Sequence, residues 1–468
     1  MVSYDEIVGK STIINHIIIA IIVLFIVLIT MLVIFRKALP LLLRMRSAGL
    51  RIAHKSKAEG VIAGRLIGPF VLYSPYCKEG HVTVIGGSGS GKSSACCIPS
   101  LISLCHAGNA SDAAPHFFAL DISGDIISNV DPNETSSIVF SPLSHTSNVT
   151  FDVFSTLRRL DDMGLRDEVD EGLADLSLIL LPKRSTGDNS KWFEDGGRDI
   201  LKASLIAYFH QGLSFPEICD KILSLDYVSL FTEIDKLDPY AAKFISQFQG
   251  MSEKNIAGCK QSATAAIQLF ATPILTKALT PSYGSLTAES IETSNIFIEI
   301  PEHQLEKYAP LMELITNSLL FYLSQRPLSN RRKIFLFIDE YASFKTLDLS
   351  APLQKLRKRN CRIVVLFQSV AQLDRNFGND ARREMMDNFE INIIFGVSDP
   401  DTAEYFSKKI GMHKKRRRTF QPYHILHSSE TEYDEYAYKP TDFARLKRHV
   451  ICISKGESFL LFKNFYFK

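Results

Sequence analysis

A glycine-rich segment at residues 86–93 has the residue types and the spacing of a phosphate-binding loop. It reads Gly-Gly-Ser-Gly-Ser-Gly-Lys-Ser and satisfies the pattern G-x-x-x-x-G-K-[ST] in full. The β-branched residues 81–85 before it predict a strand, and residues 94–98 after it predict the start of a helix. Glycines let successive backbone N–H groups surround a phosphate, and the helix N-terminus adds a positive dipole. The segment is therefore predicted to be a P-loop, because the alternative, a flexible Gly/Ser turn, needs neither the lysine nor the strand.

The motif assigns a role to each member of this loop. We expect Lys92 to bridge the β- and γ-phosphates of ATP and the hydroxyl of Ser93 to bind Mg²⁺. ATP and Mg²⁺ are thus the predicted cofactors. The expected nucleotide-binding residues are Gly86, Gly87, Ser88, Gly89, Ser90, Gly91, Lys92, Ser93 and Ser94.

Two carboxylates follow an apolar run later in the chain. Residues 333–338 read Lys-Ile-Phe-Leu-Phe-Ile and are followed by Asp339 and Glu340. An almost uninterrupted apolar run is typical of a central strand in a parallel sheet, and such sheets bind ligands where the strands end. Asp339 is predicted to hold the Mg²⁺ shell together with Ser93, and Glu340 to polarise the attacking water. The alternative is that the two carboxylates only cap the next helix.

Two further polar residues flank a second apolar run, residues 361–367. Gln368 follows this run, and in RecA-like motors the strand beside the Asp-Glu strand often ends in a polar residue that senses the γ-phosphate. Arg357 lies before the run and is predicted to reach the nucleotide of a neighbouring subunit as an arginine finger. The alternatives are a glutamine that caps a turn and an arginine at a solvated helix end. The predicted catalytic residues are Lys92, Glu340, Gln368 and Arg357.

The elements around these residues predict the α/β fold class, with a doubly wound parallel sheet. Residues 157–293 instead show the 3.6-residue periodicity of amphipathic helices and predict a helical insertion between two halves of the sheet. Further strands are expected at residues 116–120, 137–140, 295–300, 390–397 and 450–454, and an aromatic hairpin arm at 458–467.

A long apolar run near the N-terminus predicts a membrane anchor. Residues 17–35 contain Thr30 as their only non-apolar member, which is enough to span a bilayer. Asp5 and Glu6 precede the run, and the positive-inside rule places the N-terminus outside and the rest of the chain in the cytoplasm. A cleaved signal peptide is disfavoured because the basic region before the run is missing. The basic residues that follow the run are Arg36, Lys37, Arg44, Arg46, Arg51, Lys55 and Lys57.

Overall composition restricts how the chain could contact nucleic acid. The 468 residues have a formal net charge of +2, so such a contact must come from a local basic cluster. The run Lys414–Arg418 is predicted to be a loop cluster that binds phosphate backbone, although such runs are often only solvated.

The hydrophobic content of 46% supports packed cores in two or three domains. The predicted division is an external N-terminus (1–12), a transmembrane helix (13–36), a basic juxtamembrane stalk (37–65), a first nucleotide-binding part (66–156), an all-helical insertion (157–293) and a second nucleotide-binding part (294–468).

Taken together, these motifs resemble those of the type IV secretion coupling proteins, the TraG/TraD-type ATPases that bring DNA or protein substrates to a conjugation channel. The resemblance covers nearly everything after the membrane segment. It differs from the family at residues 121–125, where the family's lysine is replaced by Ser123. The resemblance rests on Gly89–Ser93, Ile98–Leu101, Ser141–Leu143, Trp192–Arg198, Phe337–Glu340, Phe367–Leu373 and Tyr466.

The resemblance implies a RecA-like P-loop ATPase in the bacterial inner membrane that assembles into a homo-hexamer. The implied cargo is DNA in single-stranded form, a relaxase-bound strand from a relaxosome, or a protein, in conjugation or plasmid mobilisation. The inner-membrane components of a type IV secretion system are further implied partners, and Arg357 matches the spacing of the family's arginine finger. Two alternatives stay open: a HerA/FtsK-type DNA translocase, and a nucleotide-gated docking scaffold that pumps nothing.

Overall fold

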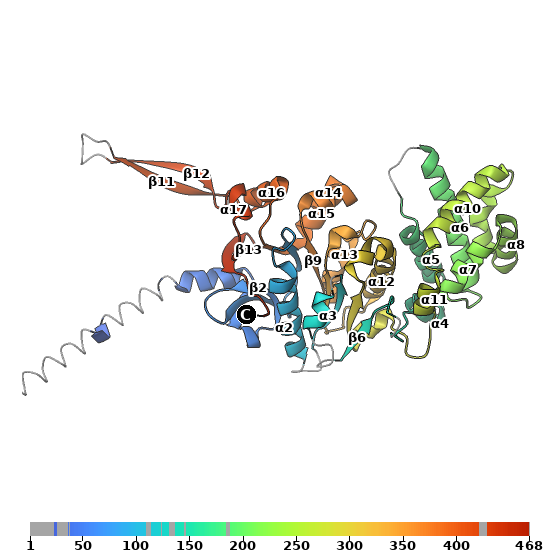
Figure 1. Ribbon diagram of the computed structural model, residues 1–468, viewed down its shortest axis with the longest axis horizontal. Coiled ribbons are helices and arrows are strands. Elements are labelled where there is room, and N and C mark those ends of the chain that lie inside the picture. The colour runs from blue at the N-terminus through green and yellow to red at the C-terminus, as the bar shows by residue number, and fades with distance from the viewer. Residues whose placement is uncertain are drawn as a thin grey trace, which may run out of the picture.

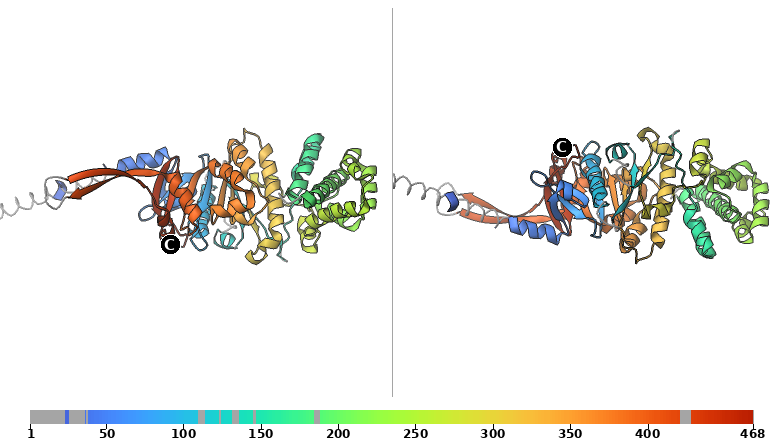
Figure 2. Two further views of the ribbon diagram at one scale, coloured as in Figure 1. Left: turned by 90° about the horizontal axis from the view of Figure 1, so that it is seen from above. Right: turned by 90° about the horizontal axis from the view of Figure 1, so that it is seen from below.

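A mixed twelve-stranded sheet forms the middle of an elongated molecule (Figure 1). A group of helices forms one end, and a two-stranded ribbon together with the helix of residues 38–47 projects from the other end (Figure 2). The computed structural model describes residues 23–25, 36, 38–108, 114–122, 124–130, 136–144, 147–183, 188–420 and 428–467.

One half of the sheet is parallel and contains the predicted motif strands. In order across the sheet, these strands are β10 (Phe389–Ile394), β4 (His81–Ile85), β9 (Cys361–Phe367), β8 (Ile334–Ile338), β5 (His116–Asp121), β7 (Asn295–Glu299) and β6 (Ser137–Phe140). The strands predicted from the sequence are confirmed, with shifts of a few residues at their ends.

The other half of the sheet is antiparallel and brings both ends of the described chain together. Continuing outward from β10, its strands are β13 (His449–Ser454), β14 (Glu457–Phe462), β2 (Gly60–Arg65), β3 (Phe70–Pro75) and β1 (Arg51–His54). The pairing of β13 with β14 confirms the predicted aromatic hairpin arm over residues 458–462, whereas residues 463–467 continue beyond the strand.

The sheet has a hydrophobic core on each face, as a doubly wound fold requires. Phe335 and Phe337 of β8 enter one core, where they join Leu101 of α2 (Ile98–Gly108). Leu336, between these two phenylalanines, enters the opposite core with Leu311 of α12 (Leu305–Gln325). Side chains alternate across a strand, so an apolar residue at every position serves both cores.

A group of helices lies between β6 and β7 in the chain. Its members are α4 (Ser155–Asp162), α5 (Arg166–Leu180), α6 (Asp188–Phe209), α7 (Phe215–Ser224), α8 (Tyr227–Leu237), α9 (Pro239–Ile245), α10 (Glu253–Ile267) and α11 (Pro273–Leu279). Two glycines let α6 and α10 approach closely. A Cβ on Gly196 would lie 2.5 Å from Cys259 Sγ, and one on Gly197 would lie 2.9 Å from the carbonyl oxygen of Cys259.

The structure corrects two predictions about charged segments. The run Lys414–Arg418 is not a loop: it lies within β11 (Met412–Phe420), which pairs antiparallel with β12 (Ser428–Tyr436). The run was mistaken for a loop because the ribbon packs on no core, so its strands lack apolar alternation. The expected stalk of residues 37–65 is also too long, because its second half forms β1 and β2, and Val61 and Ile62 are buried in the sheet.

The predicted membrane helix lies almost entirely outside the described residues, as does Ser123. Within the part of the chain that the structure describes, we find no helix long and apolar enough to cross a membrane. The described helix of residues 38–47 exposes Leu39, Leu41, Leu42 and Leu43.

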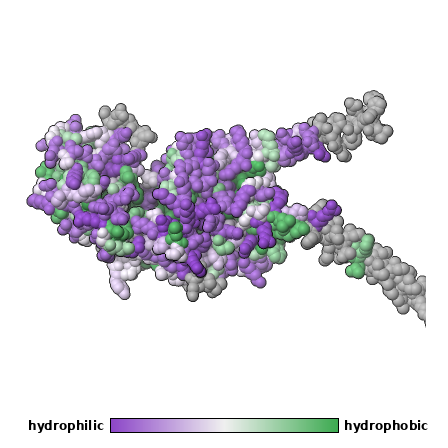
Figure 3. Space-filling model, turned by 180° about the vertical axis from the view of Figure 1, so that it is seen from behind, coloured by the Kyte–Doolittle hydropathy of each residue, from purple (hydrophilic) through white to green (hydrophobic). Residues whose placement is uncertain are grey.

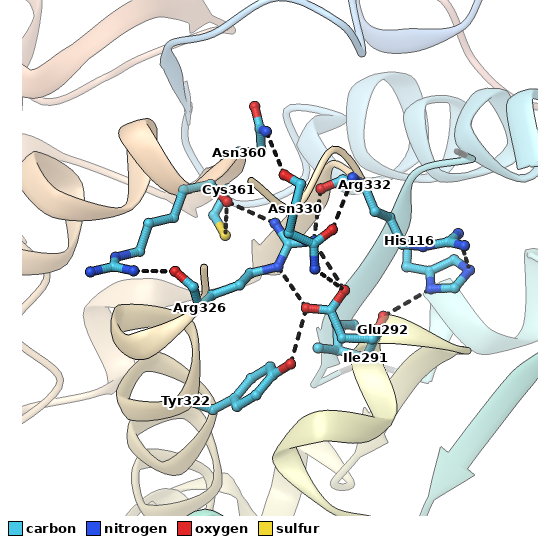
Figure 4. A network of polar contacts seen from close by, with 10 residues as sticks. His116, Ile291, Glu292, Tyr322, Arg326, Asn330, Arg332, Asn360 and Cys361 are labelled. Carbon is cyan, nitrogen blue, oxygen red and sulfur yellow. Dashed lines mark hydrogen bonds and ion pairs between the residues drawn. The ribbon is translucent and has the colours of Figure 1, made fainter. Parts of the chain in front are cut away.

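At the amino ends of the parallel strands, a network of polar side chains surrounds the fully buried Arg326 (Figure 4). Its Nε donates to Glu292 Oε1 at 2.6 Å, and its Nη2 donates to Glu292 Oε2 at 3.0 Å. Its Nη1 donates to the carbonyl oxygen of Arg359 at 2.7 Å. Tyr322 and Asn330 also donate to Glu292, so this network ties α12 to the loops that begin β7, β8 and β9.

Candidate nucleotide site

The predicted P-loop and two of the predicted motifs meet at the carboxyl edge of the parallel strands. The P-loop follows β4, Gln368 follows β9, and Asp339 follows β8. Because β9 lies between β4 and β8, these three strand ends are neighbours in space. Parallel α/β sheets bind ligands at this edge.

Backbone hydrogen bonds hold the P-loop against the ends of the strands on either side. The N–H of Gly86 donates to the carbonyl oxygen of Phe367 at 3.2 Å, and the N–H of Gly87 donates to that of Gly396 at 2.8 Å. Gly89 and Gly91 have φ angles of 68° and 95°, in the left-handed region that favours glycine. These glycines allow the tight curl that a phosphate-binding loop needs.

Lys92 is buried inside the curl of the loop. Its Nζ donates to the carbonyl oxygen of Gly86 at 2.9 Å and to that of Gly87 at 3.4 Å. Burial lowers the pKa of Lys92, although the charges of Glu340 and Asp339 oppose that shift. The ammonium is therefore held in place by neutral carbonyl groups, which leaves its charge available to an anion.

The two carboxylates at the end of β8 differ in their surroundings. Asp339 is buried and accepts a hydrogen bond from Ser93 Oγ at 3.1 Å. Burial, and then the charge of Glu340, raise the pKa of Asp339 to about 6. Glu340 has a φ of 44° and accepts a hydrogen bond from Gln368 Nε2 at 3.3 Å. The chain thus turns sharply after Asp339, with one carboxylate at the P-loop serine and the other at the end of β9.

These groups fit a nucleotide phosphate with its metal ion. Ser90 Oγ is buried and has no hydrogen-bond partner among the described atoms, so a polar group at the loop would satisfy it. The described residues contain no group of three or more His, Cys, Asp or Glu side chains that could hold a metal. A cation here would therefore take the Ser93 hydroxyl and the Asp339 carboxylate, with phosphate oxygens completing its shell.

The C-terminal arm of the chain also contacts the P-loop, which the sequence analysis missed. Lys463 is buried, and its Nζ donates to the carbonyl oxygen of Ser90 at 2.6 Å. The N–H of Tyr466 donates to the carbonyl oxygen of Ser94 at 3.1 Å, and a Cβ on Gly91 would lie 3.2 Å from the Phe465 ring. The only signal in the sequence was the aromatic character of the arm, because nothing in its spacing points to a loop more than three hundred residues earlier.

Arg357 is not at this site within its own chain. It precedes β9 whereas Gln368 follows it, and the seven residues of β9 separate the two by roughly 20 Å. Arg357 is about half exposed, and its Nε pairs with Glu79 Oε2 at 3.2 Å. Both residues line a hollow of about 310 Å³, together with Glu390 and Lys455. Any contact between Arg357 and a nucleotide must therefore involve another copy of the chain.

The sheet order and the three motifs define a P-loop protein of the RecA-like class. The model of one family, described as the type IV secretion-system coupling protein DNA-binding domain, matches residues 66–422, and the chain belongs to this family. The resemblance noted from the sequence is thereby confirmed.

Curated relatives and solved structures agree with this assignment. The protein VirD4 of Rhizobium radiobacter is 21% identical over 392 residues, which cover 78% of this chain and 53% of that protein. VirD4 of Agrobacterium fabrum is 21% identical over 403 residues, covering 80% and 56%. This chain thus spans about half the length of the curated relatives it matches.

Two solved structures of the coupling protein TrwB share the fold. TrwB in complex with the ATP analogue ADPNP has a TM-score of 0.68 at 20% identity, covering 87% of this chain and 89% of that one. The unbound TrwBdeltaN70 structure has a TM-score of 0.65 at 21% identity, covering 82% and 84%.

Proposed function

We propose that this protein is a membrane-anchored ATPase that acts as a coupling protein, recruiting DNA or a nucleoprotein and helping to move it to a type IV secretion channel. The observation that supports this most is the meeting of the P-loop, Asp339 with Glu340, and Gln368 at one edge of the sheet. A family described by its DNA-binding domain and relatives named for conjugal transfer support the coupling role.

Each residue at the site has a proposed task. The Lys92 ammonium would bind the β- and γ-phosphates, and the loop N–H groups with Ser90 would hold the phosphate oxygens. Glu340 would orient the attacking water and accept its proton, with its carboxylate held in place by the amide of Gln368. Mg²⁺, held by Ser93 and Asp339, would supply charge stabilisation to the transferring phosphoryl group.

We propose that the active unit is a ring, a homo-hexamer, in which Arg357 acts on a neighbour's nucleotide. Support comes from the distance between Arg357 and the P-loop of its own chain and from its exposed position. An arginine donated in this way neutralises the charge that grows on the γ-phosphoryl oxygens.

The proposed location is the bacterial inner membrane, with residues 13–36 as a single-pass anchor and the N-terminus outside. The exposed leucines of the helix 38–47 support a position beside the lipid. We also propose that residues 157–293 form a separate helical domain at the end of the molecule far from the membrane. Relaxase or protein cargo and inner-membrane secretion components are the proposed partners.

The test is the ATPase rate of the full chain in detergent with and without single- and double-stranded DNA. Hydrolysis that single-stranded DNA stimulates, and that Lys92→Ala abolishes, supports the coupling motor. Stimulation by double-stranded DNA alone favours a HerA/FtsK-type translocase. Nucleotide binding with no hydrolysis under any of these conditions favours the docking scaffold.

A further inference from the structure

The ribbon of β11 and β12 projects from the same end of the body as the helix of residues 38–47 (Figures 1 and 2). Each strand has nine residues, and the two form a sheet of their own. Among the described residues, the outer edge of each strand therefore pairs with no third strand. Exposed edges of this kind invite further strand pairing, and natural proteins usually block or use them.

The two strands of the ribbon carry opposite charges. The basic residues of β11 are Lys414, Lys415, Arg416, Arg417 and Arg418, and the strand contains no acid. The acidic residues of β12 are Glu430, Glu432, Asp434 and Glu435, and the strand contains no base. Apart from the exposed Met412 and Tyr433, the coloured part of the ribbon surface is mainly hydrophilic (Figure 3). Among the side chains that the structure describes, one long edge of the ribbon is thus cationic and the other is anionic.

Ion pairs within the ribbon leave these charges accessible. Arg416 Nε lies 2.8 Å from Glu432 Oε1, and Lys415 Nζ lies 2.8 Å from Glu435 Oε2. The Arg416 and Lys415 side chains are nevertheless 68% and 55% exposed, and Lys414 is 76% exposed. Each cation can therefore accept a second carboxylate from outside the ribbon.

We propose that the ribbon is a self-association surface, in which the acidic β12 of one copy pairs with the basic β11 of the next. In two ribbons that point the same way, β12 of one copy runs antiparallel to β11 of its neighbour. If the two ribbons lie in register, each residue of β12 in one copy faces the same β11 residue that it pairs with inside its own ribbon. Glu432 of one copy, for example, then faces Arg416 of the next. The strand pairing between copies therefore joins the same oppositely charged residues as the pairing inside each ribbon.

The charge pattern also selects the symmetry of this pairing. A two-fold contact would place β11 against β11 or β12 against β12, and like charges would then repel. Only a head-to-tail contact joins opposite charges, and head-to-tail contacts generate rings when the rotation closes. This inference rests on the proposed function only in assuming that the copies form a ring. It does not depend on nucleotide hydrolysis. Anionic lipid or nucleic acid is a poorer occupant, because β12 would be repelled.

The experiment measures self-association of the full chain in detergent by sedimentation. Lys414→Glu with Arg416→Glu reverses the charge of two residues of β11, which lie opposite Asp434 and Glu432, and Glu432→Lys with Asp434→Lys reverses the charge of those two partners on β12. We expect each double variant alone to associate at least tenfold more weakly than the unaltered chain, because the inter-copy contacts at these two positions then join like charges. An equal mixture of the two should associate again, since the reversed residues of one variant then face residues of opposite charge on the other.

The matched control exchanges an exposed ion pair of α16 (Pro400–Ile410), Glu404→Lys with Lys408→Glu, and should change nothing. Nucleotide binding by each ribbon variant shows that the chain is folded and keeps this test separate from that of the ATPase. Unchanged association of either variant alone, or no recovery in the mixture, overturns the proposal. Loss of binding to anionic vesicles with unchanged association also overturns it and makes the ribbon a lipid-binding element.

Discussion

The two edges of the parallel half of the sheet both bury charged groups, but they differ in how completely those groups are bonded. At the amino edge, every nitrogen of the Arg326 guanidinium donates a hydrogen bond, and Glu292 is its counter-ion (Figure 4). At the carboxyl edge, Lys92 binds only neutral carbonyls and Ser90 Oγ has no described partner. A saturated network fixes the positions of strands, whereas an unsaturated one is prepared for a ligand.

The same contrast appears in the pKa values of the carboxylates. Burial raises the pKa of Glu292, but the hydrogen bonds and charge of Arg326 outweigh burial and hold the pKa below its ordinary value. Asp339 has no such cation bonded to it, and its pKa is raised to about 6. The protein therefore stabilises the charge of Glu292 by itself but leaves that of Asp339 to an incoming cation.

The largest effects should come from the cations of the nucleotide site. Lys92→Ala and Arg357→Ala should each lower ATP hydrolysis by roughly 10³-fold or more, because each removes positive charge from the transferring phosphoryl group. Neither change should lower the melting temperature by more than a few degrees, since neither residue belongs to the amino-edge network. Steady-state hydrolysis and thermal unfolding measure the two effects.

Mixing these two inactive variants tests whether Arg357 acts between subunits. Some interfaces in a mixed ring pair an intact P-loop with an intact arginine, so activity should return. If mixed rings form but stay inactive at every ratio, Arg357 has no role in trans. Near-normal turnover by Lys92→Ala would instead rule out the P-loop assignment.

A smaller effect, specific to one step, is expected at the end of β8. Glu340→Gln should bind ATP normally but hydrolyse it roughly 10²-fold or more slowly, because the amide keeps the shape but not the proton-accepting charge. Asp339→Asn should instead weaken binding that depends on Mg²⁺. Fluorescent-nucleotide titration with and without Mg²⁺ distinguishes the two variants, and equal loss of binding in both would contradict this division of roles.

At the amino edge, the expected effect is on stability. Glu292→Gln leaves the Arg326 charge buried without its counter-ion and should lower the free energy of unfolding by about 3 kcal/mol. ATPase activity per folded molecule should be unchanged. The matched control is Glu457→Gln, which breaks the exposed pair with Arg44 and should cost about 0.5 kcal/mol or less.

The stability difference between Glu292→Gln and the unaltered chain should also depend on pH. Because the pKa of Glu292 is lowered from 4.5, its stabilisation is present at higher pH and is lost as pH falls through the lower pKa of the folded protein. The difference in free energy of unfolding between Glu292→Gln and the unaltered chain should therefore become smaller as pH falls below about 4.5. A gap that stays constant or widens in acid would contradict the ion-pair account.

The smallest effect is expected from the C-terminal arm. Lys463→Met removes one hydrogen bond to the P-loop carbonyl of Ser90 and should weaken nucleotide binding about fivefold, the equivalent of about 1 kcal/mol. Lys455→Met, which removes a lysine paired with Glu390 at the other edge, is the control and should leave the affinity unchanged. Equal affinities in both variants would mean that the arm only packs against the loop.

The sequence by itself determined the P-loop and the two motif strands, because their chemistry is local. A phosphate loop needs its glycines and Lys92 consecutively, and a buried parallel strand such as 334–338 is apolar at each position. The placement of Asp339 and Gln368 beside that loop also followed, since parallel strands end at a common edge. Their catalytic roles, and those of Glu340 and Arg357, stay predictions.

Only the tertiary structure decided which distant segments complete these local pieces. Lys463 reaches Ser90 because β14 returns the chain to the sheet, and Arg326 meets Glu292 because α12 ends near the beginnings of the strands. The sequence predicts a loop at Lys414–Arg418, but pairing with β12 makes it a strand, in which carboxylates such as Glu432 and Glu435 pair with Arg416 and Lys415. The sequences around Lys463, Arg326 and the ribbon carry no local pattern that names their distant partners. Their contacts and burial are therefore known only from the folded chain.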